Sequence, residues 1–250
     1  MTSIQIVTDD PGLKLIAAEL ATQLNLPTGD ADPGYDFWLL VTPHYLGLVK
    51  PDHKSRPFYI DFLSAKSRYR QKNLSIKNEN LARALGLKNH KPNKIIDATA
   101  GLGRDSFIIA SLGIPVDLLE RSPIIYTLLN DAIKRATNDP DTNAIASRMH
   151  LHFGNAINLL TTLESADVIY LDPMFPTRNK SAQVKKEMQI FHEIVGADAD
   201  SEDLFKVALT CARKRVVVKR PKISEHLAQV PPSYSVKGSS SRFDIYLTQE

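Results

Sequence analysis

The chain has 250 residues, of which 43% are hydrophobic and 24% charged, and its formal net charge is +3. This composition is typical of a soluble globular protein with one large domain, or one domain and a small addition. No run of about 18 apolar residues occurs, and the start lacks a secretory signal, so we expect a cytoplasmic protein with no membrane partner. A single cysteine, Cys211, excludes an internal disulfide and a cysteine-rich zinc site.

The charge is unevenly distributed along the chain. Residues 50–94 hold twelve Lys and Arg against three Asp and Glu, whereas residues 1–49 hold one against six. The densest basic stretch, residues 66–72, interleaves cations with a tyrosine, a pattern that suits phosphate contacts and base stacking. A solvated surface loop would have the same composition. With both interpretations open, the candidate RNA ligands here are Arg68, Arg70 and Lys72.

The first third of the chain predicts a small appended unit. Residues 4–7 alternate weakly, as in a short strand, and residues 13–24 show apolar positions at helical spacing. Three short apolar runs, separated by Pro, Gly and Asp, predict an antiparallel unit with strands at 37–41, 46–49 and 58–62. We therefore expect a mixed α+β domain over residues 1–65, then a basic loop and a linker helix over residues 66–93.

Strand and helix patterns alternate from residue 94 to the end. Strands are predicted at 95–98, 116–120, 149–153, 168–172 and 215–219, with a closing pair near 234–237 and 243–247. Helices are predicted at 105–112, 123–136, 156–163 and 201–211, and a polar loop follows residue 172. This alternation predicts an α/β domain over residues 94–250, with a mainly parallel sheet and an antiparallel edge. Ligands of such sheets bind at the carboxyl ends of the strands.

A glycine turn follows the first strand of this domain. The strand ends at Asp97, and Gly101 and Gly103 let the backbone turn sharply and approach a ligand closely. The third glycine of the dinucleotide fingerprint is missing, and Asp97 is a poor neighbour for a pyrophosphate. S-adenosylmethionine (SAM) suits the same turn. Its ammonium could meet Asp97 and Asp105, and its carboxylate could meet Arg104.

The next two strand ends offer groups for the rest of this cofactor. Glu120 lies about 20 residues beyond the glycine turn, where a carboxylate can bind a ribose diol. A helix cap or a surface ion pair is the alternative role for Glu120. Asn155 and Ala156 follow the third strand and could lie against an adenine, although Gly-Asn is also ordinary turn chemistry.

The strongest chemical signal is the tetrad Asp172-Pro173-Met174-Phe175. At a strand end, the carboxylate and the Pro173 carbonyl could accept both hydrogens of an exocyclic amine and aim its lone pair at an electrophilic methyl, while Phe175 stacks on the base. The tetrad resembles the (Asp/Asn/Ser)-Pro-Pro-(Tyr/Phe/Trp) motif of amino-directed methyltransferases, with Met174 in place of the second proline. Asp-Pro alone would be an ordinary strand-end turn.

Several longer stretches carry a resemblance over roughly the whole chain: DATAGLGRDSF, LLERSP, YLDPMFP, KSAQVKKEMQIFHEIVG, RVVVKRP and RFDIY. Together they resemble the bacterial small-subunit ribosomal RNA guanine-N2 methyltransferase J family. The resemblance implies a class I (Rossmann-like) methyltransferase fold, SAM as cofactor, and a guanine of 16S rRNA or of the small ribosomal subunit as substrate. It also implies cofactor contacts at Arg104, Asp105, Glu120, Arg121, Asn155, Ala156 and Asp172.

Further cations are expected at the same edge of the sheet, where they could hold RNA phosphates or simply serve solubility. They are Arg178, Lys180, Lys185, Lys219 and Arg220. His150 and His152 alternate on one strand, but no third ligand joins them, so we predict no metal site.

The predicted function is SAM-dependent methylation of the exocyclic N2 amine of a specific guanosine in 16S rRNA, with Asp172, Pro173 and Phe175 as catalytic residues. A methyltransferase acting on a DNA adenine or a protein glutamine would use the same tetrad. A non-catalytic RNA-binding ribosome assembly factor is the alternative of another class.

Overall fold

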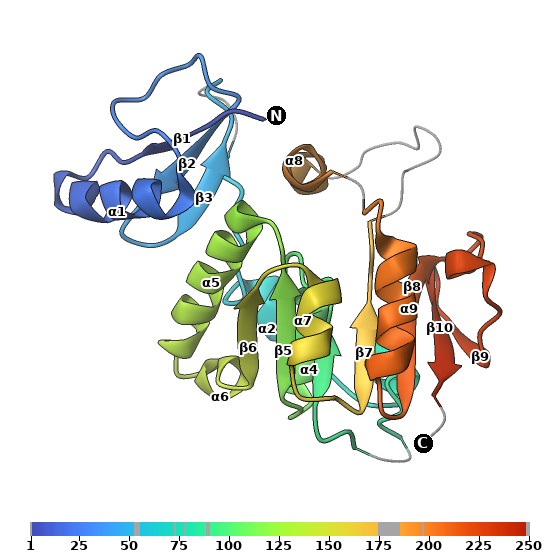
Figure 1. The fold of residues 1–250 in the computed structure, drawn as a ribbon. Coiled ribbons are helices and arrows are strands. Elements are labelled where there is room, and N and C mark those ends of the chain that lie inside the picture. Colours follow the sequence, from blue (N-terminus) through green and yellow to red (C-terminus); the bar gives the residue numbers. More distant parts are fainter. Residues whose placement is uncertain are drawn as a thin grey trace.

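The computed structural model describes residues 2–52, 56–72, 74–77, 79–88, 91–174, 186–196 and 198–248 (Figure 1). Two sheets organise these residues, a small one near the N-terminus and a seven-stranded one in the rest of the chain. Within the described ranges, no helix has the length and apolar character needed to cross a membrane.

The small sheet has the order β1-β2-β3, with α1 (Lys14–Leu24) packed beside it. Its strands are β1 (Ile4–Val7), β2 (Phe37–Val41) and β3 (Leu46–Val49). The antiparallel pairing predicted for residues 37–41 and 46–49 is confirmed, since β2 and β3 are antiparallel, and β1 joins β2 in parallel. A helix between β1 and β2 allows this parallel crossover.

The predicted strand at 58–62 is absent from the small sheet. Only Phe58 forms a bridge, to Leu48. The carbonyl of Ile60 accepts a hydrogen bond from the Arg135 side chain instead of a strand partner. A side chain far along the chain thus replaces a ladder bond, which a local pattern could not predict.

The large sheet has the order β6-β5-β4-β7-β8-β10-β9. The first five of these strands are parallel, and β10 is antiparallel to both of its neighbours, as the sequence predicted. Their bounds are β4 (Ile95–Asp97), β5 (Val116–Glu120), β6 (Met149–Phe153), β7 (Val168–Leu171), β8 (Arg215–Pro221), β9 (Tyr234–Lys237) and β10 (Ser241–Leu247). The chain reverses its direction of travel across the sheet between β4 and β7, so a ligand site is expected there.

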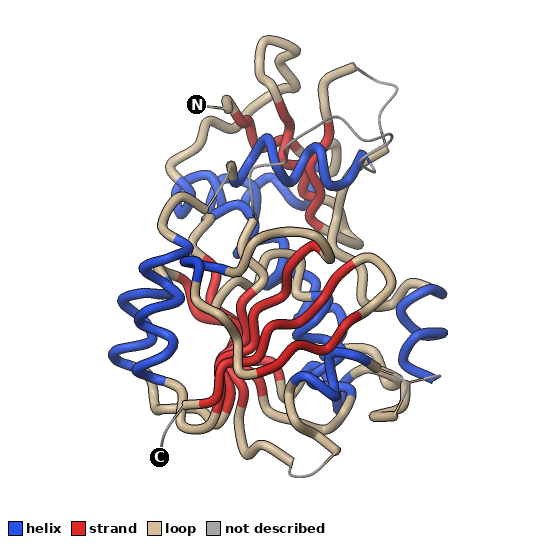
Figure 2. The backbone as a smooth tube through the Cα atoms, turned by 90° about the vertical axis from the view of Figure 1, so that its right-hand side faces the viewer, coloured by secondary structure: helices blue, strands red, loops and turns tan. Residues whose placement is uncertain are grey.

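Helices cover both faces of the large sheet (Figure 2). Ile95 and Ile96 of β4 belong to different hydrophobic clusters, because successive side chains of a strand point to opposite faces. The cluster around Ile95 includes α4 (Arg104–Ser111) and α5 (Pro123–Thr137), and the cluster around Ile96 includes α7 (Ala156–Thr162) and α9 (Ser201–Cys211). The short helices are η1 (Pro11–Leu13), α3 (Asn80–Ala84), α6 (Asn143–Ala146) and η2 (Leu227–Gln229).

Two helices lie where the sequence predicted loops. The basic stretch forms α2 (Ala65–Lys72), and the Ser64 hydroxyl accepts a hydrogen bond from Ser67 N at its start. The expected polar loop after residue 172 contains α8 (Lys186–Val195), whose Ile190 and Phe191 are buried. Figure 1 shows α8 near the small sheet, and an ion pair of 2.8 Å between Lys50 Nζ and Glu193 Oε2 joins them.

Candidate active site

A cleft of about 1410 Å³ lies at the carboxyl ends of the parallel strands. The turn after β4, the ends of β5, β6, β7 and β8, and α8 all contribute to its lining. This is the edge at which the sequence predicted the ligand.

The glycine turn forms one wall of the cleft. Gly101 and Gly103 have φ angles of +50° and +65°, a region that L side chains rarely adopt. A Cβ on Gly103 would lie 2.6 Å from Leu129 Cδ1, and one on Gly101 would lie 3.2 Å from Phe191 Cζ. Gly103 therefore packs against the core with no room for a side chain, and Gly101 lines the cleft.

Glu120 closes the end of β5 beside this turn. Its carboxylate accepts hydrogen bonds from Gly101 N (3.0 Å) and Ser122 N (2.7 Å). Burial raises the pKa of Glu120, and these backbone N–H groups oppose the rise. Each carboxylate oxygen has two lone pairs, so the group can still accept hydroxyl hydrogens from a ligand.

Asp97 lies beneath the glycine turn, almost fully buried. It accepts hydrogen bonds from the Ser106 hydroxyl and from Thr99 N (3.2 Å). Burial raises the pKa of Asp97 to about 7, although Ser106 and Thr99 stabilise the charged form. Asp97 can therefore change its charge near neutral pH.

A cationic side chain joins two carboxylates at the opposite wall. Lys219 Nζ lies 2.8 Å from Asp105 Oδ2 and 2.8 Å from Asp172 Oδ2. The hydroxyl of Tyr170 donates to Asp105 Oδ2 at 2.6 Å. Asp172 follows β7 and Lys219 lies on the neighbouring strand β8, whereas Asp105 comes from α4 (Figure 1).

The charges of this cluster depend on one another. Burial alone would raise the pKa of Asp105, but Lys219, Tyr170 and the more distant Arg70 together hold it below its usual value. Burial raises the pKa of Asp172, and Lys219 opposes that rise. Burial would lower the pKa of Lys219, yet the two carboxylates raise it above its ordinary value. Lys219 therefore stays positively charged.

The segment after β7 is tied to its neighbours on both sides. Asp172 N donates to Thr99 Oγ1 at 2.6 Å, and Met174 N donates to Asp198 Oδ2 at 2.7 Å. Arg121 pairs with Asp198 and, through both carboxylate oxygens, with Asp200 at 2.8 Å. These contacts fix the position of Asp172 and Pro173 in the cleft.

The structure brings most of the predicted site residues together, but it changes the surroundings of several. Arg121 and Lys219 line the cleft, and acidic side chains engage both of them: Asp198 and Asp200 for Arg121, Asp105 and Asp172 for Lys219. Arg220 is buried and donates to the carbonyl of Glu225, which does not suit a phosphate ligand. Arg220 nevertheless lines the cleft, and the RNA contact expected there stays a prediction.

Of the other predicted residues, two line the cleft, two lie outside it, and four fall outside the described ranges. The Asn155 side chain accepts from Ile157 N at 2.8 Å and caps α7, with Ala156 beside it in the cleft lining. Arg68 is held by Asp139 and Asp141, and Lys72 is exposed on α2. Residues that fall outside the described ranges are Phe175, Arg178, Lys180 and Lys185.

Sequence reasoning missed four contributors to the site: Thr99, Tyr170, Asp198 and Asp200. Tyr170 had a usable signal, because it lies two residues before Asp172 on the same face of β7. Asp198 and Asp200 had none, since their role depends on the path of the chain between α8 and α9.

The comparisons with known proteins agree with this geometry. A family model for SAM-dependent methyltransferases matches residues 19–248. The ribosomal RNA small subunit methyltransferase J of Thioalkalivibrio sulfidiphilus is 45% identical, with 98% of this chain and 97% of that protein covered. The chain belongs to the ribosomal RNA small subunit methyltransferase J family.

Another relative and a solved structure are similar to this chain along nearly its whole length. The Aeromonas salmonicida protein of the same name is 44% identical, over 98% of this chain and 97% of its own length. A crystal structure of a SAM-dependent methyltransferase from Neisseria gonorrhoeae superposes with a TM-score of 0.76 at 37% identity, covering 97% of this chain and 95% of that one. The fold is therefore the class I methyltransferase fold, and the cofactor of this family is SAM.

The cleft fits that cofactor. The glycine turn presents bare backbone, Glu120 presents a buried carboxylate, and Asp97 and Asp105 place acidic groups at the same edge. SAM supplies an electrophilic methyl group when it is bound.

Proposed function

We propose that this chain methylates the exocyclic N2 amine of a guanosine in the RNA of the small ribosomal subunit. The observation that carries the proposal is the position of Asp172 and Pro173, at the end of β7 in the same cleft as the glycine turn. The names of the relatives support the class of RNA. A ribosomal substrate also supports our expectation of a cytoplasmic protein.

We assign the cofactor-binding residues by their places in the cleft. Asp97, Arg104 and the Gly101–Gly103 turn would hold the amino-acid end of SAM, and Glu120 would bind the ribose. Asn155 and Ala156 would lie along the adenine. Arg121 would act indirectly: it pairs with Asp198, which in turn holds the segment after Pro173.

The mechanism that we propose is mainly positioning. The lone pair of a guanine amine is delocalised into the ring, so the amine must be oriented and its developing charge stabilised. Lys219 occupies Asp172 Oδ2, and we assign Oδ1 and the Pro173 carbonyl to the two amine hydrogens. Asp172 and Pro173 would hold the amine toward the electrophilic methyl that SAM would supply, and the methylated amine would then lose one proton to water. Holding the reacting atoms in line supplies most of the acceleration.

The experiment that tests this function offers labelled SAM with four acceptors: small subunits lacking modification, deproteinised 16S rRNA, DNA and a protein extract. We expect label in small-subunit RNA, at the N2 position of one guanosine. Label in adenine of DNA, or in glutamine, would overturn the proposal. Incorporation into none of them, with RNA binding retained, would favour an assembly factor.

Asp172→Ala gives the matching test of the residue assignment. We expect methyl transfer to fall by about 100-fold or more, because a methyl side chain accepts no hydrogen bond from the amine and cannot stabilise the charge that develops on it. The Kd for SAM should change by less than about threefold, since other groups hold the cofactor. Near-normal turnover of the variant on RNA would contradict the role of Asp172.

A further inference from the structure

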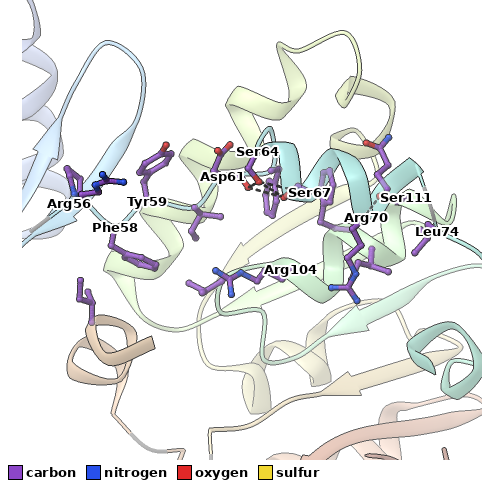
Figure 3. Close-up of a pocket in the computed structure, with 18 residues that line it drawn as sticks. Arg56, Phe58, Tyr59, Asp61, Ser64, Ser67, Arg70, Leu74, Arg104 and Ser111 are labelled. Carbon is purple, nitrogen blue, oxygen red and sulfur yellow. Dashed lines mark hydrogen bonds between the residues drawn. The ribbon is translucent and has the colours of Figure 1, made fainter. Parts of the chain in front are cut away.

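A second cavity, of about 780 Å³, lies beside the active-site cleft (Figure 3). Its walls are the segment 56–64, α2 and α4, with Ile190 of α8 at the border. Figure 3 shows Arg56, Phe58 and Tyr59 toward one end, Arg70 and Leu74 toward the other, and Arg104 between them. The volume lies within the range of pockets that bind small ligands.

The walls of this cavity are held in place by internal contacts. The rings of Phe62 and Phe107 stack with centroids 4.6 Å apart, which joins the segment 56–64 to α4. The hydroxyls of Ser64 and Ser67 donate to the carbonyl of Asp61 at 3.4 and 3.2 Å, which joins the same segment to α2. A ligand would therefore enter a cavity whose aromatic and apolar surface is already organised.

The chemistry of the lining selects a class of ligand. Three arginines line the cavity and, among its described lining residues, Asp61 is the sole acid. Asp61 Oδ1 accepts from Leu63 N at 2.9 Å, so that carboxylate already has a partner. Aromatic and aliphatic side chains make up most of the remaining surface, with polar atoms from Gln71 and Ser111. Cations around an apolar, partly aromatic cavity suit a nucleotide, which has a flat base and an anionic phosphate.

The position of the cavity indicates which nucleotide it would bind. Arg70, Leu102 and Arg104 line both this cavity and the active-site cleft. A nucleotide in the second cavity would therefore lie next to the nucleotide whose amine meets Asp172. Successive or nearly successive nucleotides of one RNA strand can span neighbouring sites of this kind.

We propose that the second cavity binds the unstacked base of an RNA nucleotide that flanks the target guanosine, with Arg70, which also lies 3.3 Å from Glu79, near its phosphate. This inference rests on the proposed function and deepens it, because it assigns part of the substrate recognition to α2 and the segment 56–64. An enzyme that acts on a base must take it out of its stack, and holding a neighbour apart would favour that state.

The first test fills the cavity from two different walls, with Gln71→Trp on α2 and Ser111→Trp on α4. Ala65→Trp adds the same side chain to an exposed position of α2 outside the cavity and is the matched control. We expect each filling variant to raise the Kd for deproteinised 16S rRNA, and the KM for small subunits, by about tenfold, the loss typical of one stacked base. The control, the Kd for SAM and the melting temperature should stay near wild-type values.

The second test replaces Gln71 with photoreactive benzoylphenylalanine and irradiates the variant with small subunits. We expect a crosslink to a nucleotide within a few positions of the methylated guanosine, and no such crosslink from the same group at position 65. Wild-type RNA affinity in both filling variants, or a crosslink to ribosomal protein alone, would overturn the inference. Failure of the wild type to methylate any RNA would instead refute the proposed function, so the two failures are distinguishable.

Discussion

At the scale of single residues, Lys219 controls the charge of Asp172. Its ammonium opposes the rise in the pKa of Asp172 that burial causes, so removal of the ammonium should raise that pKa further. In Lys219→Met we expect kcat/KM at pH 7 to fall by about tenfold or more, and the acidic limb of the pH–rate profile to move to higher pH by about one unit. Part of the activity should return at pH 9.

Lys214→Met is the matched control for Lys219→Met. It removes a lysine just before β8, at the opposite end from the site, where Lys214 lies 3.7 Å from Asp167. Its pH–rate profile should match that of the wild type. An unshifted acidic limb in Lys219→Met would show that Lys219 does not set the charge of Asp172.

Asp97 should make the stability of the cofactor-free protein depend on pH. The native state holds the Asp97 proton up to about pH 7, whereas the unfolded chain releases it near its ordinary value of 3.8. The native state therefore binds more protons between these values, and this contribution to stability is lost as pH rises through 7. The free energy of unfolding of Asp97→Asn minus that of the wild type should therefore be larger at pH 8 than at pH 5, by on the order of 2–4 kcal/mol.

Urea unfolding of both proteins at pH 5 and pH 8 measures this difference. Parallel pH dependence in the wild type and Asp97→Asn would contradict the raised pKa. The same variant should also bind SAM more weakly above pH 7, where the ionised Asp97 would otherwise meet the cofactor ammonium.

At the scale of elements, the contacts of Arg121 join the end of β5 to the chain between α8 and α9. Arg121→Met would release Asp198 and, with it, the backbone of Met174. We expect kcat to fall by about tenfold, because misplacement of the catalytic segment weakens positioning. Stability should change little, since the side chain of Arg121 is 37% exposed and such ion pairs contribute about 1 kcal/mol or less.

The Kd for SAM distinguishes the two possible roles of Arg121. It should change by less than about threefold if Arg121 only positions the segment after Pro173. A rise of tenfold or more would instead support the direct cofactor contact that the sequence suggested. Lys206→Met, which breaks an exposed pair with Asp203 on α9, is the control for loss of a surface cation.

The elements that position the site differed in how well the sequence predicted them. Asp97, Glu120 and Asp172 lie at or just after strand ends, and a local pattern of apolar residues is enough to locate such ends. The pairing of Lys219 with Asp172 depends on the pairing of β7 with β8, which the sheet order decides and no local pattern records. The helix α8 had an apolar periodicity, but its polar flanks obscured it.

At the scale of the whole molecule, the basic block of residues 50–94 is partly neutralised by acids from elsewhere. Arg68 meets Asp139 and Asp141, and Lys94 lies 3.1 Å from Asp117. The charge count of this block predicted RNA contacts without this information. The sequence therefore located the basic region correctly but could not tell which of its cations face a ligand.

The different surroundings of Arg70 and Arg68 predict how RNA binding responds to salt. RNA affinity should fall steeply with salt, because phosphate contacts release counterions. Arg70→Ala should reduce the slope of log K against log salt by about 0.7–0.9, as expected for the loss of one phosphate contact. Arg70 also has an internal partner, Glu79, at 3.3 Å, but it lines both the cavity and the cleft. Arg68 is held by two acids and lines neither of them, so Arg68→Ala should leave the slope unchanged. Equal effects of the two substitutions would contradict the proposed path of the RNA.

The strand order also has a consequence for how the enzyme is made. β4 lies in the interior of the sheet, between β5, which follows it closely, and β7, which comes much later in the chain. A nascent chain on the ribosome can therefore pair the strands around Glu120 before it contains Asp172 or Lys219. Until β7 emerges, one side of β4 is an unpaired apolar edge, the kind of surface to which chaperones and other chains bind. The strands next to Asp172 and Lys219 are therefore synthesised after those around Glu120, and the exposed edge of β4 is covered only when β7 pairs with it.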